Sequence, residues 1–253
     1  MSGAEFLAQP KKAITFIGMS GVGKSYMSHQ LEQWGWVSYS SDYLIGTEYL
    51  DDVMRETLSF EETLGKDNME FLSSFVGKLG NPDQGGLLLE EFQKRQKFYY
   101  DAECQSLIDM QGALDKTSGH FVCDSSGSLC EVEDESILER VGQGSVVVYL
   151  KVKQEGHAEI LDRAFKFPKP LYFPPAFLLE RLERYKEKFD LSGVEEIDPL
   201  EFLRWVFPHL FESRLPKYQR IADQYGVTIS SHIMGAIKSE DDFLQLVARG
   251  LDE

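Results

Sequence analysis

The fold is decided by the stretch Gly18-Met19-Ser20-Gly21-Val22-Gly23-Lys24-Ser25, which fits the pattern G-x-x-x-x-G-K-[S/T] at every fixed position. In such a loop, glycines let backbone N–H groups close around phosphate oxygens. Lys24 can neutralise the β- and γ-phosphates of a nucleotide, and the Ser25 hydroxyl can ligate Mg²⁺. The stretch therefore predicts a phosphate-binding loop. A glycine-rich turn without a ligand is the alternative.

The residues on both sides of the loop have the order that such a loop requires. Residues 13–17 form a short apolar, β-branched and aromatic run that is typical of a buried strand. After the loop, Met27, Leu31 and Trp34 recur at helical spacing. Strands alternate with helices along the chain, which predicts an α/β fold with a parallel sheet. The further strands are expected at residues 36–40, 120–124, 144–152 and 227–229.

The composition is strongly acidic, with 42 Asp and Glu against 26 Lys and Arg and a formal net charge of −16 over 253 residues. That charge repels nucleic acid and anionic membrane surfaces, so we expect neither as a partner and favour a small molecule or a protein. No apolar stretch reaches the roughly 18 residues of a membrane span. Three cysteines without metal-ligand spacing, and no apolar signal in residues 1–12, favour the cytoplasm. The oligomeric state cannot be read from the sequence.

An acid, Asp42, comes directly after the strand expected at residues 36–40. In open parallel sheets, ligands bind at the carboxyl ends of the strands. An acid at that edge can contact the hydroxyl group of a substrate. The sequence therefore predicts a site role for Asp42. The alternative is that Asp42 is the N-cap of a helix over residues 43–50.

A second acid, Asp124, ends a short apolar run and is followed by Ser125, Ser126 and Gly127. A buried strand with this pattern delivers the acid to the same edge of the sheet. An acid there can hold Mg²⁺ or its water molecules. We therefore expect Asp124 to be a metal ligand, and the alternative is an Asp that caps a turn.

Two long helical segments interrupt the strand pattern, and we treat residues 1–253 as a single domain that contains both. The first, at about residues 47–111, is expected to cover the site, and it carries Arg95 on an amphipathic helix. An ordinary solvated helix face explains Arg95 nearly as well. The second, at about residues 165–208, begins with prolines and aromatics around Lys169. That run fits either a semi-rigid flap over the phosphates or a surface connector.

The order of these motifs resembles the shikimate kinase family and its gluconate-kinase-like relatives among the P-loop kinases. The glycine loop and residues 36–45 are similar to the nucleotide loop and second strand of that family. Residues 161–163 and 169–171 look like its adenine-side arginine and its lid, and residues 213–223 look like its Arg-x-Pro-x-Tyr-x-x-x-Ala helix. The resemblance implies the P-loop nucleoside triphosphate hydrolase/kinase fold, a three-layer sandwich.

The resemblance also implies roles for individual residues. The family's acid after the second strand accepts the proton of the substrate hydroxyl, which is the role implied for Asp42. Its helix arginine grips the carboxylate of the substrate, which is the role implied for Arg214. The resemblance implies that Arg163 and Lys169 contact the nucleotide. Arg95 is a candidate for the second arginine that binds the substrate in that family. Lys169 stands where the family has an arginine, so the charge is kept and the bidentate fork is lost.

Two departures from the family lie on the acceptor side. Ser40 stands at the first acid of the family's Asp-x-Asp pair, so metal binding is expected to have moved to Asp124. Of a stretch that is normally three glycines contacting the substrate, only Gly127 remains. These changes leave the nucleotide chemistry intact and argue against shikimate itself as the acceptor.

The sequence therefore predicts an ATP-dependent kinase that phosphorylates a hydroxyl of a small, anionic metabolite with ATP and Mg²⁺. A nucleotide-dependent switch on a kinase fold, and an acidic structural protein with an accidental loop, are the alternatives. A GTPase is disfavoured because no Asn-Lys-x-Asp motif is present. The expected contacts are Gly18, Ser20, Gly21, Val22, Gly23, Lys24, Ser25, Tyr26, Arg163 and Lys169 for the nucleotide, Ser25 and Asp124 for the metal, and Asp42, Arg95, Gly127 and Arg214 for the acceptor. Lys24 and Asp42 are the expected catalytic pair.

Overall fold

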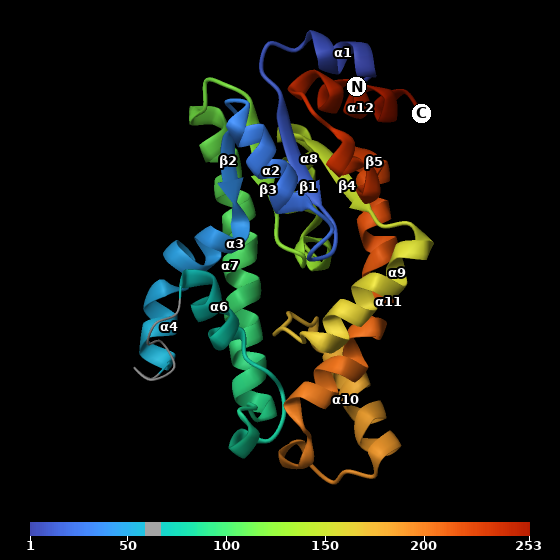
Figure 1. Cartoon of the computed structure of the whole chain (residues 1–253). Helices are drawn as coiled ribbons and strands as arrows, with labels where there is room; N and C mark the ends of the chain where they lie inside the picture. Colours follow the sequence, from blue (N-terminus) through green and yellow to red (C-terminus); the bar gives the residue numbers. More distant parts are fainter. Residues whose placement is uncertain (59–66) are drawn as a thin grey trace. The chain divides into compact units, whose positions relative to one another are not determined.

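The structure, a computed structural model, describes residues 1–58 and 67–253. Among these residues, five strands form one sheet in the order β2-β3-β1-β4-β5, and every neighbouring pair is parallel. Figure 1 shows β1 between β3 and β4. The predicted parallel α/β sheet is confirmed. The strand bounds are β1 Ala13–Ile17, β2 Val37–Ser40, β3 Phe121–Asp124, β4 Val146–Lys151 and β5 Gly226–Ser230.

The centre of the sheet is covered on both faces. Successive residues of a strand point to opposite faces of a sheet. In β4 every residue from Val146 to Leu150 is buried, and in β1 every residue from Ile14 to Ile17 is buried. Continuous apolar runs of this kind are typical of parallel strands that pack against helices on both sides. The three-layer sandwich expected from the sequence follows from this burial.

The chain divides into two compact units. The first unit consists of Met1–Asp42, Cys104–His157 and Arg214–Glu253 and contains the sheet. The second unit consists of Tyr43–Glu103 and Ala158–Ser213. The single domain of residues 1–253, with insertions at about residues 47–111 and 165–208, stays a prediction. Residues 59–66 of the first insertion lie outside the described residues.

Helices surround the sheet in the first unit. The helix after the glycine loop, α2, packs against β2 and β3, while α8 packs against β4 and α12 against β5. Near the two ends of the chain α1 lies beside α12 (Figure 1), where the Gly3 N–H donates to the Asp252 carboxylate at 2.8 Å. No helix among the described residues is long and apolar enough to cross a bilayer. The bounds are α1 Gly3–Ala8, α2 Lys24–Gln33, α3 Ser41–Leu44, α8 Glu135–Gly144 and α12 Glu240–Asp252, with short helical turns at Leu129–Glu131 and Ser231–Ala236.

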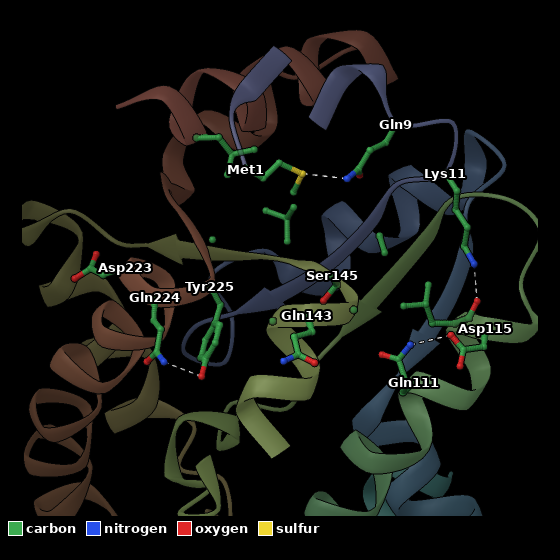
Figure 2. Close-up of a pocket in the computed structure, with 17 residues that line it drawn as sticks. Met1, Gln9, Lys11, Gln111, Asp115, Gln143, Ser145, Asp223, Gln224 and Tyr225 are labelled. Atoms are coloured by element: carbon green, nitrogen blue, oxygen red, sulfur yellow. Dashed lines mark hydrogen bonds between the residues drawn. The ribbon is translucent and has the colours of Figure 1, made fainter. Parts of the chain in front are cut away.

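A polar pocket of about 650 Å³ opens at the amino ends of β1, β4 and β5 (Figure 2). Several of its polar side chains bond to one another or to nearby backbone. Gln111 donates to Asp115 at 2.8 Å, Gln224 donates to the Tyr225 hydroxyl at 2.8 Å, and the Lys11 ammonium donates to two backbone carbonyls. None of the predicted site residues lines this pocket.

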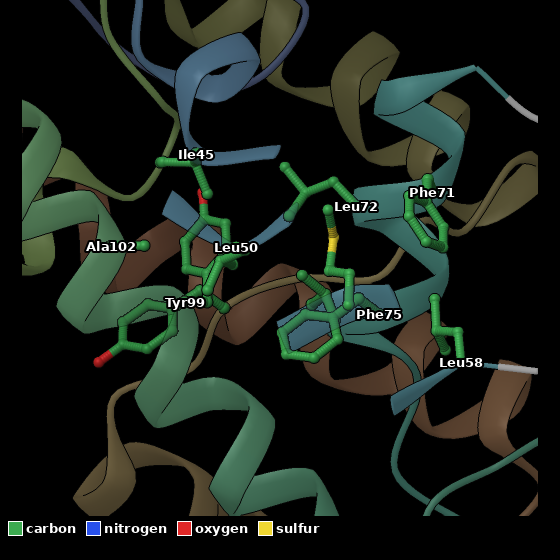
Figure 3. Close-up of a cluster of buried hydrophobic side chains, with 11 residues drawn as sticks. Ile45, Leu50, Leu58, Phe71, Leu72, Phe75, Tyr99 and Ala102 are labelled. Atoms are coloured by element: carbon green, nitrogen blue, oxygen red, sulfur yellow. The ribbon is translucent and has the colours of Figure 1, made fainter. Parts of the chain in front are cut away.

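The second unit is helical and contains two hydrophobic clusters. The first cluster joins Ile45 and Leu50 to Phe75 of α6 and Tyr99 of α7 (Figure 3). The second joins α10 and α11 through residues such as Leu182 and Phe202. Each cluster buries large apolar side chains, which is the main source of stability in such a unit. The bounds are α4 Asp51–Thr57, α6 Asn68–Val76, α7 Leu89–Lys116, α9 Gln154–Lys166, α10 Pro175–Phe189 and α11 Pro199–Tyr225, with short turns at Ile45–Tyr49, Pro82–Gln84 and Val194–Glu196.

The close approach of β4 and β5 at Gly226 predicts a severe effect of Gly226→Ala. A Cβ atom there would lie 1.7 Å from the carbonyl oxygen of Val147, so the backbone of β4 or β5 would have to shift. We expect a loss of about 3 kcal/mol or more in the free energy of unfolding, measured by urea denaturation. The control is Gly112→Ala in α7, where a Cβ atom meets nothing within 4 Å. We expect the control to gain about 0.5–1 kcal/mol, and equal effects of the two changes would contradict the strand pairing.

Candidate functional site

The glycine loop lies at the carboxyl end of β1 and leads into α2. Gly18 has a φ angle of 138° and Gly23 one of 103°, conformations that a residue with a Cβ atom rarely adopts. Gly23 is the N-cap of α2, so the unpaired N–H groups of the first helical turn open toward the loop. Such a helix start attracts anions. Of the remaining predicted nucleotide contacts, Ser20, Gly21, Ser25 and Tyr26 are exposed, and Val22 is buried.

Lys24 is buried at the first position of α2. Its ammonium donates to the carbonyl oxygens of Gly18 at 2.8 Å and Met19 at 3.3 Å, so it lies across the loop that it belongs to. Burial lowers the pKa of Lys24, and the charges of Asp124 and Asp42 oppose that shift. The three charged groups therefore lie close enough to influence one another.

The parallel register explains why these groups meet. Asp124 ends β3 and pairs with Phe16 of β1 on one side and with Ser40 of β2 on the other. Asp42 lies two residues after Ser40, in the first turn of α3. The carboxyl ends of β1, β2 and β3 thus bring Asp42, Asp124 and the glycine loop to one edge of the sheet. Asp42 therefore lies within the first turn of a short helix and is not its N-cap.

Asp124 is a largely buried carboxylate that lies beside Ser25 of the glycine loop. Burial raises the pKa of its carboxyl group, while a hydrogen bond with Ser25 and the charge of Lys24 oppose the shift. Its Oδ1 atom is buried and has no hydrogen-bond partner among the described residues. A buried carboxylate oxygen of this kind needs a partner, and Mg²⁺ commonly takes one or two protein oxygens and completes its shell with phosphates and water. Ser25 and Asp124 therefore fit Mg²⁺ in the form that accompanies a nucleotide. No cluster of three or more His, Cys, Asp or Glu ligands occurs among the described residues.

The segment after β3 packs against the glycine loop. The Ser125 hydroxyl donates to the Phe16 carbonyl at 2.6 Å, which fixes the segment to the end of β1. A Cβ atom added to Gly127 would lie 3.5 Å from the backbone nitrogen of Ser20. The Gly127 carbonyl accepts hydrogen bonds from Arg214 and from the Tyr218 hydroxyl. Gly127 is thus held beside the loop, and its contact with an acceptor stays a prediction.

Arg214 is held by the protein itself. Its Nε donates to the Glu131 carboxylate at 2.9 Å, and one terminal nitrogen donates to the Gly127 carbonyl at 3.0 Å. The Arg214 side chain is 3% exposed and that of Glu131 is 1% exposed, so the ion pair is buried. The Lys217 ammonium bonds the second oxygen of the same carboxylate. Contact of Arg214 with an acceptor stays a prediction.

Three of the predicted site residues belong to the second unit. Arg95 is buried in α7, where it donates to Glu91 at 2.7 Å and to the Phe75 carbonyl at 3.2 Å. Arg163 is exposed near the end of α9, and Lys169 is exposed in the segment between α9 and α10. Their roles on the nucleotide and the acceptor stay predictions.

Sequence reasoning missed the supporting residues Glu131 and Ser125. Glu131 lies in a short helical turn that matches no motif, between the third strand and the helix after it. The signal that points to it is chemical, since a buried arginine requires a carboxylate partner. Four acids lie close together at Glu131, Glu133, Asp134 and Glu135, so the sequence does not single out the partner.

The fold and this site define an α/β protein with a glycine loop at the carboxyl edge of its parallel sheet. Several solved structures are similar to it. A shikimate kinase from Acinetobacter baumannii in complex with shikimate matches with a TM-score of 0.39 and 16% identity, over 96% of this chain and 93% of that chain. A shikimate kinase from Bacteroides thetaiotaomicron matches with a TM-score of 0.35 and 14% identity, over 79% and 98% of the two chains. A gluconokinase from Sinorhizobium meliloti matches with a TM-score of 0.31 and 15% identity, over 85% and 96%.

The resemblance to shikimate kinase-like P-loop kinases thus appears among solved structures as well as in the motifs. No family model matches the chain, and no curated protein matches it. With TM-scores below 0.5, the substrate and the chemistry have to be argued from the residues of this chain.

The raised pKa of Asp124 predicts how stability depends on pH. The folded chain keeps the proton of Asp124 to a higher pH than the unfolded chain, whose ordinary value is 3.8. Above that value the ionisation of Asp124 costs stability, so its contribution to the free energy of unfolding falls as the pH rises. We expect Asp124→Asn to be more stable than the wild type at about pH 7 and to lose that advantage toward about pH 4. Urea denaturation at a series of pH values measures the difference. A destabilised variant at neutral pH would refute the burial argument.

Proposed function

We propose that this chain transfers the γ-phosphoryl group of ATP to a hydroxyl of a small molecule. The observation that carries the proposal is the meeting of Lys24, Asp42 and Asp124 with the glycine loop at one edge of the sheet. Phosphoryl transfer depends mainly on positioning and on neutralising charge. An edge with a loop of N–H groups, a buried cation and two carboxylates supplies both.

The loop and Lys24 bind the triphosphate in this proposal. The N–H groups at the start of α2 receive phosphate oxygens, and the Lys24 ammonium lies within reach of the loop that holds them. Because Lys24 is buried, its interaction with a phosphate is less screened than it would be at the surface. Mg²⁺, when bound, would neutralise phosphate charge and orient the phosphates, with Ser25 and Asp124 as its protein ligands.

Asp42 acts as the base for the acceptor hydroxyl. The bond between the γ-phosphorus and the bridging oxygen of ADP breaks, and a bond forms between that phosphorus and the acceptor oxygen. The hydroxyl proton passes to the Asp42 carboxylate, and ADP leaves. A positioned base of this kind contributes about 10²–10⁴ in rate. Asp124 is unsuited to this role because its carboxylate serves the metal.

The charge of the acceptor is a separate question. The expectation of an anionic metabolite depends chiefly on Arg214, and the guanidinium of Arg214 bonds Glu131 and the Gly127 carbonyl. The proposed function therefore names a hydroxyl acceptor and leaves the anionic group out.

The role of Asp42 predicts that its substitution lowers the rate of phosphoryl transfer and leaves the affinity for MgATP almost unchanged. In Asp42→Asn we expect the rate of phosphoryl transfer to fall about 10²-fold or more, because the amide cannot take the proton. The Kd for MgATP should stay within about threefold of the wild type. Transfer is followed by ³¹P NMR with a panel of polyols and sugars, and ATP binding by calorimetry. The matched control is Glu32→Gln on the exposed face of α2. Unchanged transfer in Asp42→Asn would remove Asp42 from the mechanism.

The role of Lys24 predicts a loss at the binding step. In Lys24→Met we expect the affinity for MgATP to fall about 100-fold or more, since the buried positive charge facing the phosphates is gone. Calorimetric titration measures the loss, and circular dichroism checks the fold. Lys116→Met, which removes an exposed cation from the last turn of α7, is the control and should bind MgATP as the wild type does. Equal affinities for all three proteins would show that the loop does not bind the triphosphate.

A further inference from the structure

Glu131 is the centre of a buried charge cluster beside the proposed site. Its carboxylate accepts a hydrogen bond from the Nε of Arg214 at 2.9 Å and another from the ammonium of Lys217. The carboxylate is 1% exposed and the Arg214 side chain is 3% exposed, whereas the Lys217 side chain is 41% exposed. The guanidinium of Arg214 is thus already matched to a carboxylate inside the protein.

An acceptor carboxylate would have to displace Glu131 to bind the Nε of Arg214. Glu131 is tethered in place, so its effective concentration at Arg214 far exceeds that of a dissolved metabolite. Displacement would also leave the Glu131 carboxylate buried without its arginine partner, which is costly in a medium of low dielectric constant. An incoming carboxylate therefore gains little from Arg214 while Glu131 is present.

Arg214 has another task in this arrangement. One of its terminal nitrogens donates to the Gly127 carbonyl at 3.0 Å, and the Tyr218 hydroxyl bonds the same oxygen. Tyr218 also contacts the Met19 sulfur of the glycine loop at 3.6 Å. The helix α11 thereby holds the segment after β3 against the loop. In this way Arg214 acts as a positioning residue.

The charge cluster keeps one net positive charge. Glu131 contributes −1, while Arg214 and Lys217 contribute +1 each. The exposed member is Lys217, so any attraction that the cluster exerts on a dissolved anion is exerted mainly at its ammonium. A point charge at the surface, screened by solvent, is a weak basis for selecting a carboxylate.

We propose that Glu131 determines acceptor specificity: it is a built-in carboxylate that occupies Arg214, so that the acceptor is a hydroxyl compound without a carboxylate bound to that arginine. The statement about the acceptor rests on the proposed phosphoryl transfer. The pairing of Glu131 with Arg214 does not depend on phosphoryl transfer. It can therefore be tested by thermal unfolding, without an enzymatic reaction.

The direct test is chemical rescue of Glu131→Ala. Removing the carboxylate leaves space beside Arg214, and acetate is small enough to enter it. We expect about 0.2 M sodium acetate to raise the Tm of the variant by about 2–4 °C relative to sodium chloride at equal ionic strength, with no such difference for the wild type. In Glu131→Ala/Arg214→Met the acetate effect should disappear. Absence of rescue in a folded Glu131→Ala protein would overturn the proposal.

A second measurement uses the wild-type fold and decides the matter even where Glu131→Ala does not fold. Gluconate and glucitol differ in a carboxylate against a hydroxymethyl group, and each is added to the ATP-analogue complex of the wild type and of Lys217→Met. We expect the Tm of the wild type to be the same with the two compounds. A higher Tm with gluconate also agrees with the proposal if the difference disappears in Lys217→Met. An excess for gluconate that persists in Lys217→Met would mean that Arg214 is open to carboxylates, which would overturn the proposal. Failure of phosphoryl transfer in the separate turnover assay would overturn the proposed function and the statement about the acceptor, and it would leave the occupation of Arg214 by Glu131 as it stands.

Discussion

The parallel pairing of β1, β2 and β3 is the constraint on which the site depends. It places Phe16, Asp124 and Ser40 in one row across three neighbouring strands. The segments that leave these strands therefore start at the same edge of the sheet: the glycine loop after β1, α3 with Asp42 after β2, and the serine-rich segment after β3. A shift of one residue in β3 would turn Asp124 to the opposite face and separate it from Ser25. The chemistry of this edge is thus fixed by hydrogen bonds between backbones.

Burial of charge is the second feature of the site. Lys24, Asp124, Arg214 and Glu131 all lie in surroundings that disfavour isolated charges, and each is opposed by a neighbour of the other sign. Two solutions are present. Arg214 and Glu131 neutralise each other with direct hydrogen bonds, whereas Asp124 keeps a buried oxygen without a hydrogen-bond partner among the described residues. The Arg214–Glu131 pair is suited to stabilising the fold, whereas the buried oxygen of Asp124 is suited to binding a ligand.

Much of the sheet and the position of the glycine loop at its carboxyl edge were predictable from sequence. The glycine loop, the apolar runs and the acids after them specify strands and their carboxyl ends locally. The predicted strands at residues 13–17, 36–40 and 120–124 are therefore confirmed with bounds within one residue. The partner of Arg214 was beyond reach, because a buried ion pair between α11 and the turn after β3 depends on packing between segments 83 residues apart. Arg95 illustrates the same limit, since its bonds to Glu91 and the Phe75 carbonyl depend on how α6 meets α7.

The proposed phosphoryl transfer is tested most directly by a crystal structure with a non-hydrolysable ATP analogue and Mg²⁺. It predicts the triphosphate in the glycine loop with Lys24 on the γ-phosphate, the metal between Ser25 and Asp124, and the Asp42 carboxylate about 3–6 Å from the γ-phosphate on the acceptor side. A nucleotide bound elsewhere, or a metal held without Asp124, would contradict it.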